Sequence, residues 1–348
     1  MSGVAAHRPR RPAAETPAVA RRPDHLAGGP LEGDRTAPAR RPAAARGPIV
    51  RRPVVGRTVA RVGFVLPVIL YLALFFLYPL IGNVILSFQD FGIQSVYSGQ
   101  ASFNGLDNYL HLFHDPVFGT AVVNTVVFVI GSLFFQFAIG LGLAVFFTKA
   151  FPLGGLLRTL LLIPWLLPLV VTGTVFRWIL DTSNGVANHV LLALHLVSEP
   201  VPWLNSVHTA MIGVLLCNVW IGIPFNMVIL HGGLQSIPAE LHEAAALDGA
   251  SGFDRFRHIT APLLRPVVAV VLTLGLIYTI KVFDVIWVMT KGGPADATQT
   301  VTTYGYQLSF GGLSQFGLGA AASNLLIVVA LVFAVFYLRS TRAETAVT

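Results

Sequence analysis

The amino-acid sequence predicts an all-α, polytopic membrane protein with six transmembrane helices. Of its 348 residues, 54% are hydrophobic and only 11% are charged, whereas a soluble domain carries about 25% charged residues. The mean hydropathy is +0.71. Apolar runs are spread over residues 62–340, and each is long enough to cross a bilayer, which takes about 20 residues of helix. We therefore expect one six-helix membrane domain over 62–340.

Residues 1–61 form a block of different composition, rich in Arg, Pro and Ala. Repeated Arg-Arg-Pro runs break helices and repel one another, so we expect a disordered cytoplasmic tail. Two roles stay open for it. It could hold anionic lipid, at about 1 kcal/mol per basic residue near the surface, or its charge could simply keep this end of the chain in the cytoplasm. The first apolar run starts too late and is too long for a cleavable signal peptide.

The six spans and their orientation follow from the apolar runs and from the basic residues between them. Thirteen Arg precede the first span, and further Lys and Arg lie in or beside the second and fourth connections and after the sixth span. The alternate connections hold only Lys291. Both termini, including a short tail at 341–348, and the connection 236–262 are thus predicted to be cytoplasmic. The expected spans are 62–86, 120–147, 157–180, 208–231, 263–289 and 318–338.

The connection 236–262, here named the polar segment, is charged and lies between two long apolar runs. Its sequence predicts two short helices with a break between them. Ser236 is a candidate N-cap for the first helix, and Gly249 is expected to stop that helix in a left-handed conformation. Ser251 begins a capping box for the second helix, which Pro262 is expected to end. Such a segment could be a plain connector or a docking element for another protein.

The polar segment resembles the coupling loop of the membrane subunits of ATP-binding-cassette importers. In that family the loop sits in a cleft of the cytosolic ATPase. The resemblance implies that Glu243 and Asp248 contact basic groups of the ATPase and that Gly249 lets the two backbones approach. The residues that carry it are Glu243, Ala244, Ala245, Asp248, Gly249, Ile259 and Pro262.

Other stretches narrow the resemblance to the sugar-importing branch of these permeases, the maltose and glycerol-phosphate type. They are GLDNY, DPVFG and NTVVF, and the passage that begins KVFDVIWVMTKGGP. The resemblance implies the type I importer permease fold in a bacterial inner membrane. It also implies four kinds of partner: a sugar substrate, a second homologous permease, two cytosolic ATPases that bind ATP and Mg²⁺, and an extracytoplasmic solute-binding protein.

The chain lacks the residues of several enzyme classes. It has only three lysines, and none stands between Gly and Ser or Thr as in a phosphate-binding loop, so this chain is not expected to hydrolyse ATP. His242 and Glu243 begin a His-Glu-x-x-His zinc motif, but position 246 is Ala. The single cysteine, Cys217, lies in an apolar run and is expected to be a core residue. We expect no catalytic residue, metal, cofactor or nucleic-acid partner in this chain.

Polar residues inside the predicted spans are candidates for a translocation path, because each is costly in lipid unless it is paired or faces water. Tyr278, Lys281 and Asp284 are three residues apart along the fifth span and are expected to share a face of one helix. Lys281 and Asp284 could line the path or could neutralise each other. The two asparagines could bind a solute or could join helices. Prolines in the third and fourth spans fit helices that move. The candidates are Asn218, Trp220, Asn226, Tyr278, Lys281 and Asp284.

We therefore expect the permease subunit of a binding-protein-dependent sugar importer. The alternative is a secondary transporter or channel for a small polar solute, which would need its own coupling-ion site and usually has an internal inverted repeat. No such repeat is evident. A membrane enzyme is disfavoured because the catalytic and metal-binding motifs considered above are missing.

Overall fold

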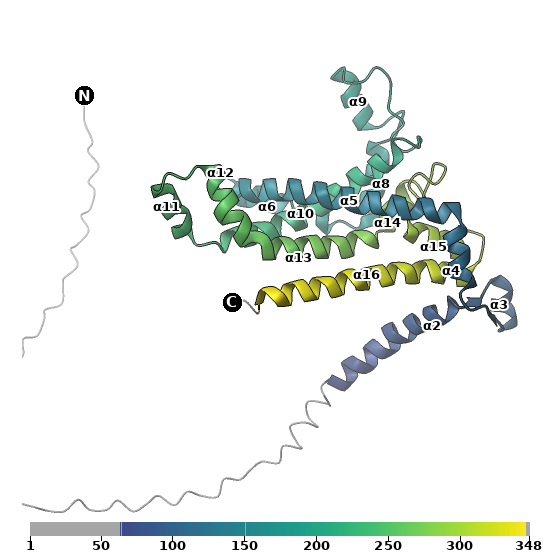
Figure 1. Cartoon of the computed structure of the whole chain (residues 1–348). Coiled ribbons are helices and arrows are strands. Elements are labelled where there is room, and N and C mark those ends of the chain that lie inside the picture. Colours follow the sequence, from purple (N-terminus) through teal and green to yellow (C-terminus); the bar gives the residue numbers. More distant parts are fainter. Residues whose placement is uncertain (1–62, 64, 150, 346–348) are drawn as a thin grey trace, which may run out of the picture. The chain divides into compact units, whose positions relative to one another are not determined.

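The computed structural model describes residues 63, 65–149 and 151–345, with side chains of the last helix described as far as 335. This part of the chain is almost entirely helical and contains one two-stranded antiparallel sheet (Figure 1). The tail 1–61, predicted to be disordered, lies outside the described residues. The elements are η1 (Ala73–Leu77), α2 (Tyr78–Leu86), β1 (Gln89–Asp90), α3 (Ile93–Ser98), β2 (Ser102–Phe103), α4 (Asp107–His114), α5 (Pro116–Phe146), α6 (Gly154–Leu160), α7 (Ile163–Leu166), α8 (Leu169–Ile179), α9 (Val186–Ala193), α10 (Ala210–Gln235), α11 (Ala239–Leu247), α12 (Gly252–Arg255), η2 (Phe256–Thr260), α13 (Ala261–Ile280), α14 (Asp284–Met289), α15 (Val301–Phe310) and α16 (Phe316–Thr345).

Five helices in the described part are long and apolar enough to cross a membrane, and a pair of helices bent at a break gives a sixth span when the pair is counted as one. The predicted all-α class with six apolar segments is therefore confirmed. α16 continues beyond the predicted end of its span, into the proposed tail 341–348. The spans are Val65–Leu86, Pro116–Phe146, the pair Gly154–Leu166 and Leu169–Ile179, then Ala210–Gln235, Gly252–Ile280 and Phe316–Val335.

The third predicted span, 157–180, is not one helix. Its two halves, Gly154–Leu166 and Leu169–Ile179, meet at an angle of 98°. Pro168 has no N–H to donate, and it disfavours the helical conformation of the residue before it. Leu167 accordingly has an extended ψ of 143°. The prediction named the right cause, proline, but expected a kink and not a full break.

The fifth predicted span, 263–289, is wrong at both ends. A continuous helix, Gly252–Ile280, begins within the polar segment and comprises α12, η2 and α13. Pro262, expected to end a helix, lies instead in the first turn of α13. The preceding π-helical turn η2 changes the hydrogen-bond pattern there, because the N–H of Ala261 bonds to the carbonyl of Phe256. α13 then stops at Ile280, and α14 is a separate helix.

Helices α5 and α10 pack along a stripe of small and polar residues. On α5, every fourth residue from Ser132 to Ala144 is buried. Gly140 lies so close to α10 that an added Cβ would stand 2.6 Å from the Cβ of Asn226. Asn218 Nδ2 donates to Ser132 Oγ at 2.9 Å. Small residues permit this close approach, and the hydrogen bond satisfies polar groups that lipid could not. The pair forms the centre of the bundle.

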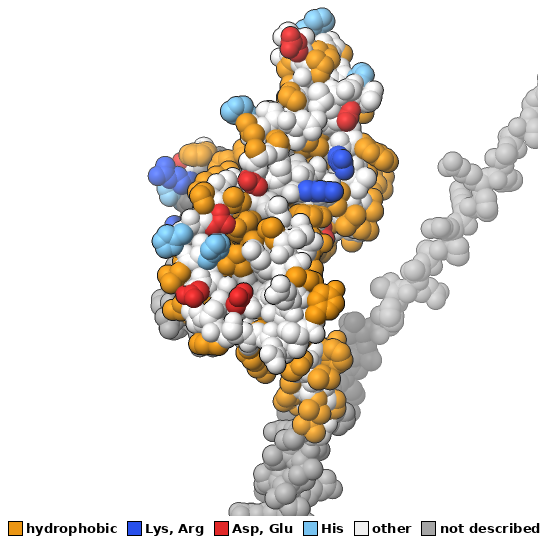
Figure 2. Space-filling view, turned by 90° about the vertical axis from the view of Figure 1, so that its right-hand side faces the viewer, with side chains coloured by type: hydrophobic (Ala, Val, Ile, Leu, Met, Phe, Trp, Pro, Cys, Tyr) orange, Lys and Arg blue, Asp and Glu red, His pale blue; other side chains and the backbone are white. Residues whose placement is uncertain are grey.

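The two ends of the bundle carry different elements. α6, α11 and α12 lie at one end, where α16 also finishes, and α3, α4 and α15 lie at the other (Figure 1). We call these the α11 end and the α4 end. At the α4 end, Asn108 Nδ2 donates to the carbonyls of Ser87 and Gln89, both at 2.9 Å, and so ties α4 to the sheet. Few Lys and Arg side chains are visible in Figure 2, which views this end.

Candidate functional site

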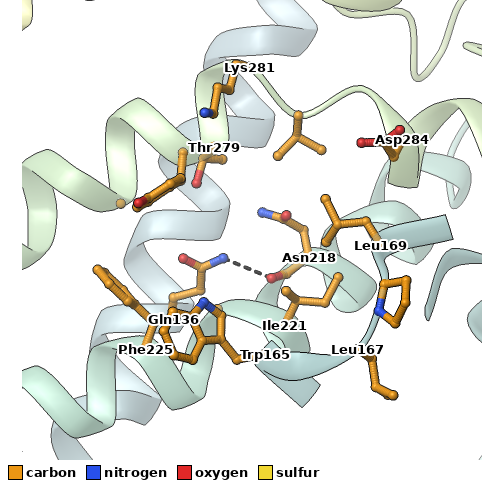
Figure 3. A pocket seen from close by; sticks show the side chains of 15 residues that line it. Gln136, Trp165, Leu167, Leu169, Asn218, Ile221, Phe225, Thr279, Lys281 and Asp284 are labelled. Carbon is orange, nitrogen blue, oxygen red and sulfur yellow. Dashed lines mark hydrogen bonds between the residues drawn. The ribbon is translucent and has the colours of Figure 1, made fainter. Parts of the chain in front are cut away.

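A cavity of about 620 Å³ opens beside the break in the third span (Figure 3). Its walls come from α5, α7, α10, α13 and α14, together with Leu167, Pro168 and Leu169 at the break. Irregular backbone at membrane depth is tolerated where it lines such a cavity. The polar side chains on its wall are Gln136, Asn218, Tyr278, Thr279, Lys281 and Asp284.

Four of the six candidate path residues therefore line this cavity, whereas Trp220 and Asn226 do not. On α10 the lining residues are Asn218, Ile221, Gly222 and Phe225, which share one face of a helix. Trp220 lies on the opposite side of that helix, at about 100° per residue, and packs against Phe176 with ring centroids 5.4 Å apart. Asn226 is buried against α5. Both residues were grouped with the path by chemical type. Helical periodicity separates Trp220 from the lining face, and close packing against Gly140 of α5 buries Asn226.

The side chains of Tyr278, Lys281 and Asp284 were predicted to share a face of one helix. The structure contradicts this, because α13 ends at Ile280 and Asp284 begins α14. All three still reach the cavity, since the chain turns at its wall. Lys281 Nζ lies 5.3 Å from the ring centroid of Tyr278. In Figure 3 the ammonium of Lys281 points away from Asp284, so mutual neutralisation does not describe this pair.

Gln136 is a lining residue that the sequence analysis missed. Its side chain is only 4% exposed, and Nε2 donates to the backbone carbonyl of Asn218 at 2.9 Å (Figure 3). A Cβ at Gly222 would collide with the Gln136 side chain, so the glycine leaves the space that the amide occupies. An amide in the middle of an apolar run is itself a signal. Applied to the second span, that rule finds Gln136.

Three aromatic rings complete the cavity wall. Trp165 and Phe225 have centroids 6.0 Å apart, and Phe225 and Tyr278 have centroids 5.9 Å apart. Aromatic faces pack on apolar C–H surfaces, while the amide, hydroxyl and charged groups beside them offer hydrogen bonds. This combination suits a solute with many hydroxyl groups. Within the described residues, no group of three or more His, Cys, Asp or Glu side chains could hold a metal ion.

The polar segment contains the predicted helix, break and helix. α11 ends in a Schellman motif in which Ala250 N–H bonds to Ala245 C=O at 2.9 Å and Gly249 N–H bonds to Ala246 C=O at 3.1 Å. Gly249 has a φ of +82°. A residue with a side chain is strained in this left-handed conformation, so the predicted role of Gly249 as the helix stop is confirmed.

The predicted cap of the second helix is also present. The Ser251 hydroxyl accepts from Asp254 N–H, and the Asp254 carboxylate accepts from Ser251 N–H, each at 3.2 Å. The Asp254 carboxylate also accepts from the Ser251 hydroxyl at 2.5 Å, which completes the cap.

The expected N-cap at Ser236 is wrong. Ser236 closes α10 instead, with its hydroxyl donating to Gly233 C=O at 2.7 Å, and α11 begins after Pro238.

The predicted coupling residues fall into two groups by exposure. Glu243, Ala244, Asp248 and Gly249 are exposed on α11 and the break, and Leu247 beside them is 91% exposed. Ala245 is half-buried, as are Ile259 and Pro262 in the helix that returns to the bundle.

Both ends of the polar segment continue toward the cavity. α10 precedes the segment and carries Asn218 and Phe225, whereas the helix Gly252–Ile280 follows and carries Tyr278 and Thr279. Its 29 residues make a rod of about 43 Å. A displacement of α11 would therefore be carried to two walls of the cavity.

Comparison with known proteins shows relatives over most of the chain. Residues 136–343 match the family described as binding-protein-dependent transport system inner membrane component. The chain is 33% identical over 282 residues to the trehalose/maltose transport system permease protein MalF of Thermococcus litoralis, covering 80% of this chain and 93% of the relative. It is 35% identical over 282 residues to the sulfoquinovosyl glycerol transport system permease protein SmoG of Agrobacterium fabrum, covering 80% and 89%.

The fold is similar to that of a chain in the crystal structure of a bacterial alginate ABC transporter in complex with an alginate pentasaccharide-bound periplasmic protein. The TM-score is 0.71 and the sequence identity 24%, over 84% of this chain and 97% of that chain. The predicted importer-permease fold is thereby confirmed.

Proposed function

Because the chain belongs to the family of binding-protein-dependent transport system inner membrane components, we propose that it is the permease subunit of an ATP-driven importer of sugars. The observation that carries this proposal is the cavity at the broken third span. It offers amide, hydroxyl and charged groups beside three aromatic rings, which is the chemistry that a polyhydroxylated solute requires. The names of the relatives, trehalose/maltose and sulfoquinovosyl glycerol permeases, support the same substrate class.

We assign the energy source to a separate cytosolic ATPase that binds ATP and Mg²⁺. The chain has no phosphate-binding loop of its own. The polar segment offers a docking surface, since Glu243, Asp248 and Leu247 are exposed at the α11 end. In this arrangement the carboxylates face basic groups of the ATPase, and Gly249 permits close approach of the two backbones. The α11 end and both termini then lie in the cytoplasm of a bacterial cell, and the α4 end faces outward.

The outward face would receive an extracytoplasmic solute-binding protein, and a second, homologous permease would complete the path. Two features support the second permease. No residue of η1 or α2 in the first span is buried. An apolar groove of about 660 Å³ also runs between α5, α13, α15 and α16. A helical partner would cover both surfaces, and the path would lie between the two subunits.

The proposed mechanism is mechanical. ATP-driven closure of the ATPases displaces α11, and α10 and the helix Gly252–Ile280 tilt with it, because both are continuous with the polar segment. The cavity walls that carry Asn218 and Tyr278, together with α5 packed along α10, then move relative to the broken third span. The cavity opens alternately to the two sides, as in transporters whose halves rock around a fixed site.

The substitution Gly249→Asp tests this proposal. It places a side chain at a φ of +82° and adds a negative charge at the docking surface. We expect ATP-driven uptake to fall to background while the chain still inserts into the membrane. The measurement is uptake of the solute held by the companion binding protein, in proteoliposomes that contain the complete importer.

Gly99→Asp is the matched control. Gly99 also has a positive φ, of +69°, and an added Cβ meets nothing within 4 Å at either glycine, so the local strain is similar. Gly99 lies at the α4 end, and its variant should transport normally. Normal uptake by Gly249→Asp would refute the coupling role.

A further inference from the structure

A row of aromatic rings runs over the α4 end from the mouth of the cavity. Phe283 begins it, and both of its sequence neighbours line the cavity. The centroid of Phe283 is 5.5 Å from that of Trp287 and 4.7 Å from that of Tyr306. Tyr306 is in turn 4.7 Å from Trp287 and 5.3 Å from Phe310. We name these four residues the aromatic track.

The aromatic track lies outside the long spans. Phe283 is the N-cap of α14, Trp287 lies in α14, and Tyr306 and Phe310 lie in α15. These two helices connect the span Gly252–Ile280 to the span Phe316–Val335. Aromatic residues that anchor a protein in lipid form belts around the bundle at the interface. These rings instead form one row that leads to the cavity, which points to a ligand of that cavity.

The track is built on fixed elements. Thr302 Oγ1 donates to the carbonyl of Val282 at 2.9 Å and so ties α15 to the turn at the cavity wall. The N–H of Val301 donates to Thr125 Oγ1 on α5 at 3.0 Å. The rings are therefore held in place without being covered.

Exposure of the rings increases along the row. Phe283 and Trp287 are half-buried, Tyr306 is 36% exposed and Phe310 is 67% exposed. The hydroxyl of Tyr306 makes no hydrogen bond within the described part of the chain, so a polar group is available beside the apolar faces.

We propose that the aromatic track is a stacking site for the sugar rings of an oligosaccharide and delivers them to the cavity. This inference rests on the proposed function, since it takes the solute to be a sugar. The C–H face of a sugar ring packs on an aromatic face, and its hydroxyl groups bond to Tyr306. Phe283, Trp287 and Tyr306 form one contact group and Phe310 extends from it, so the track offers more than one stacking position. The ligand it suits is a chain of sugars.

Uptake kinetics of Tyr306→Leu and Phe310→Leu test the track in the reconstituted importer. The probes are radiolabelled mono- and tetrasaccharides of glucose, galactose, mannose and arabinose. For the sugar series that the wild type transports, each variant should raise the KM of the tetrasaccharide about tenfold, as expected for a loss of about 1.4 kcal/mol. The monosaccharide KM and both kcat values should stay within about twofold.

Phe134→Leu is the control, because Phe134 is 64% exposed on the span α5 and its aromatic neighbour is Phe135, which is not part of the track. This variant should leave all constants unchanged. If the wild type takes up the probes and both track variants keep the wild-type KM for the tetrasaccharide, the track is overturned. The proposed function then stays intact. If the track variants lose uptake of the monosaccharide and the tetrasaccharide equally, and also lose thermal stability, the rings are lipid or packing contacts. This result also overturns the track. Failure of the wild type to take up any probe overturns the sugar proposal and the track with it.

Discussion

Among the described residues, Lys281 and Asp284 bring the only two charges to the cavity wall, and they do so from different elements. Lys281 caps α13 and Asp284 begins α14. Because Lys281 stacks over Tyr278 and points away from Asp284, each charge is available to a ligand in the cavity. The two residues are close in the sequence, but they reach the cavity wall from two different helices.

The double variant Lys281→Met and Asp284→Asn tests this assignment. It keeps the net charge of the wall and nearly the same volume. If both groups bond to the solute, each lost charged hydrogen bond costs about 1.5–3 kcal/mol, and KM for uptake should rise at least about tenfold. Solute-dependent uptake rates in proteoliposomes provide the measurement. Unaltered transport by a normally folded double variant would leave the two residues with a structural role only.

At the residue scale, the sequence indicated which polar residues matter better than it indicated which helix face each of them occupies. Polar groups within apolar runs identified Asn218, Tyr278, Lys281 and Asp284, all of which line the cavity. Trp220 was misplaced because a residue's type does not say which helix face it occupies. Asn226 was misplaced because its burial depends on the glycine opposite it, Gly140, and no local pattern reveals which helix that glycine faces.

At the element scale, the contact between α5 and α10 decides how rigidly the bundle can move. Gly140→Ala tests it. Its Cβ would stand 2.6 Å from Asn226 Cβ and 3.2 Å from the backbone nitrogen of Met227, and neither atom belongs to a flexible chain end. Overpacking of this kind costs about 1–3 kcal/mol. The midpoint of thermal unfolding in detergent should fall.

Gly142→Ala is the matched control on the same helix, because its added Cβ meets nothing within 4 Å. Alanine is favoured over glycine within a helix by roughly 0.5–1 kcal/mol, so this variant should be neutral or slightly stabilised. Equal midpoints for Gly140→Ala and Gly142→Ala would show that α5 and α10 are not in close contact there.

Element positions were predictable, but element ends were not. Hydropathy located all six apolar segments, because lipid requires long apolar helices, and it placed the centres of five within a few residues; the fifth, 263–289, was displaced toward the C-terminus from Gly252–Ile280. At the 98° break at Pro168, backbone groups lose their helical hydrogen-bond partners, which is tolerated at membrane depth because the break lines a cavity. The sequence does not reveal that cavity. The continuity of Gly252–Ile280 through Pro262 depends on a π-helical turn, and no residue type specifies such a turn.

At the scale of the whole molecule, two helices join the polar segment to the cavity as one unit. α10 enters the segment and the helix Gly252–Ile280 leaves it, and each lines the cavity farther along. The broken third span is not continuous with the segment, whereas α5 packs closely along α10. A push on α11 would therefore shift one set of walls against the other, which is the relative motion that alternating access requires.

The central claim is that this unit is driven by a separate ATPase that docks on α11. The most direct measurement is solute uptake into proteoliposomes that contain this chain, its second permease and the binding protein, with and without the ATPase and ATP. We expect the solute to accumulate in the proteoliposomes only when both the ATPase and ATP are present. When either is left out, only leakage of the solute is expected. Accumulation of the solute by the permeases alone would contradict it.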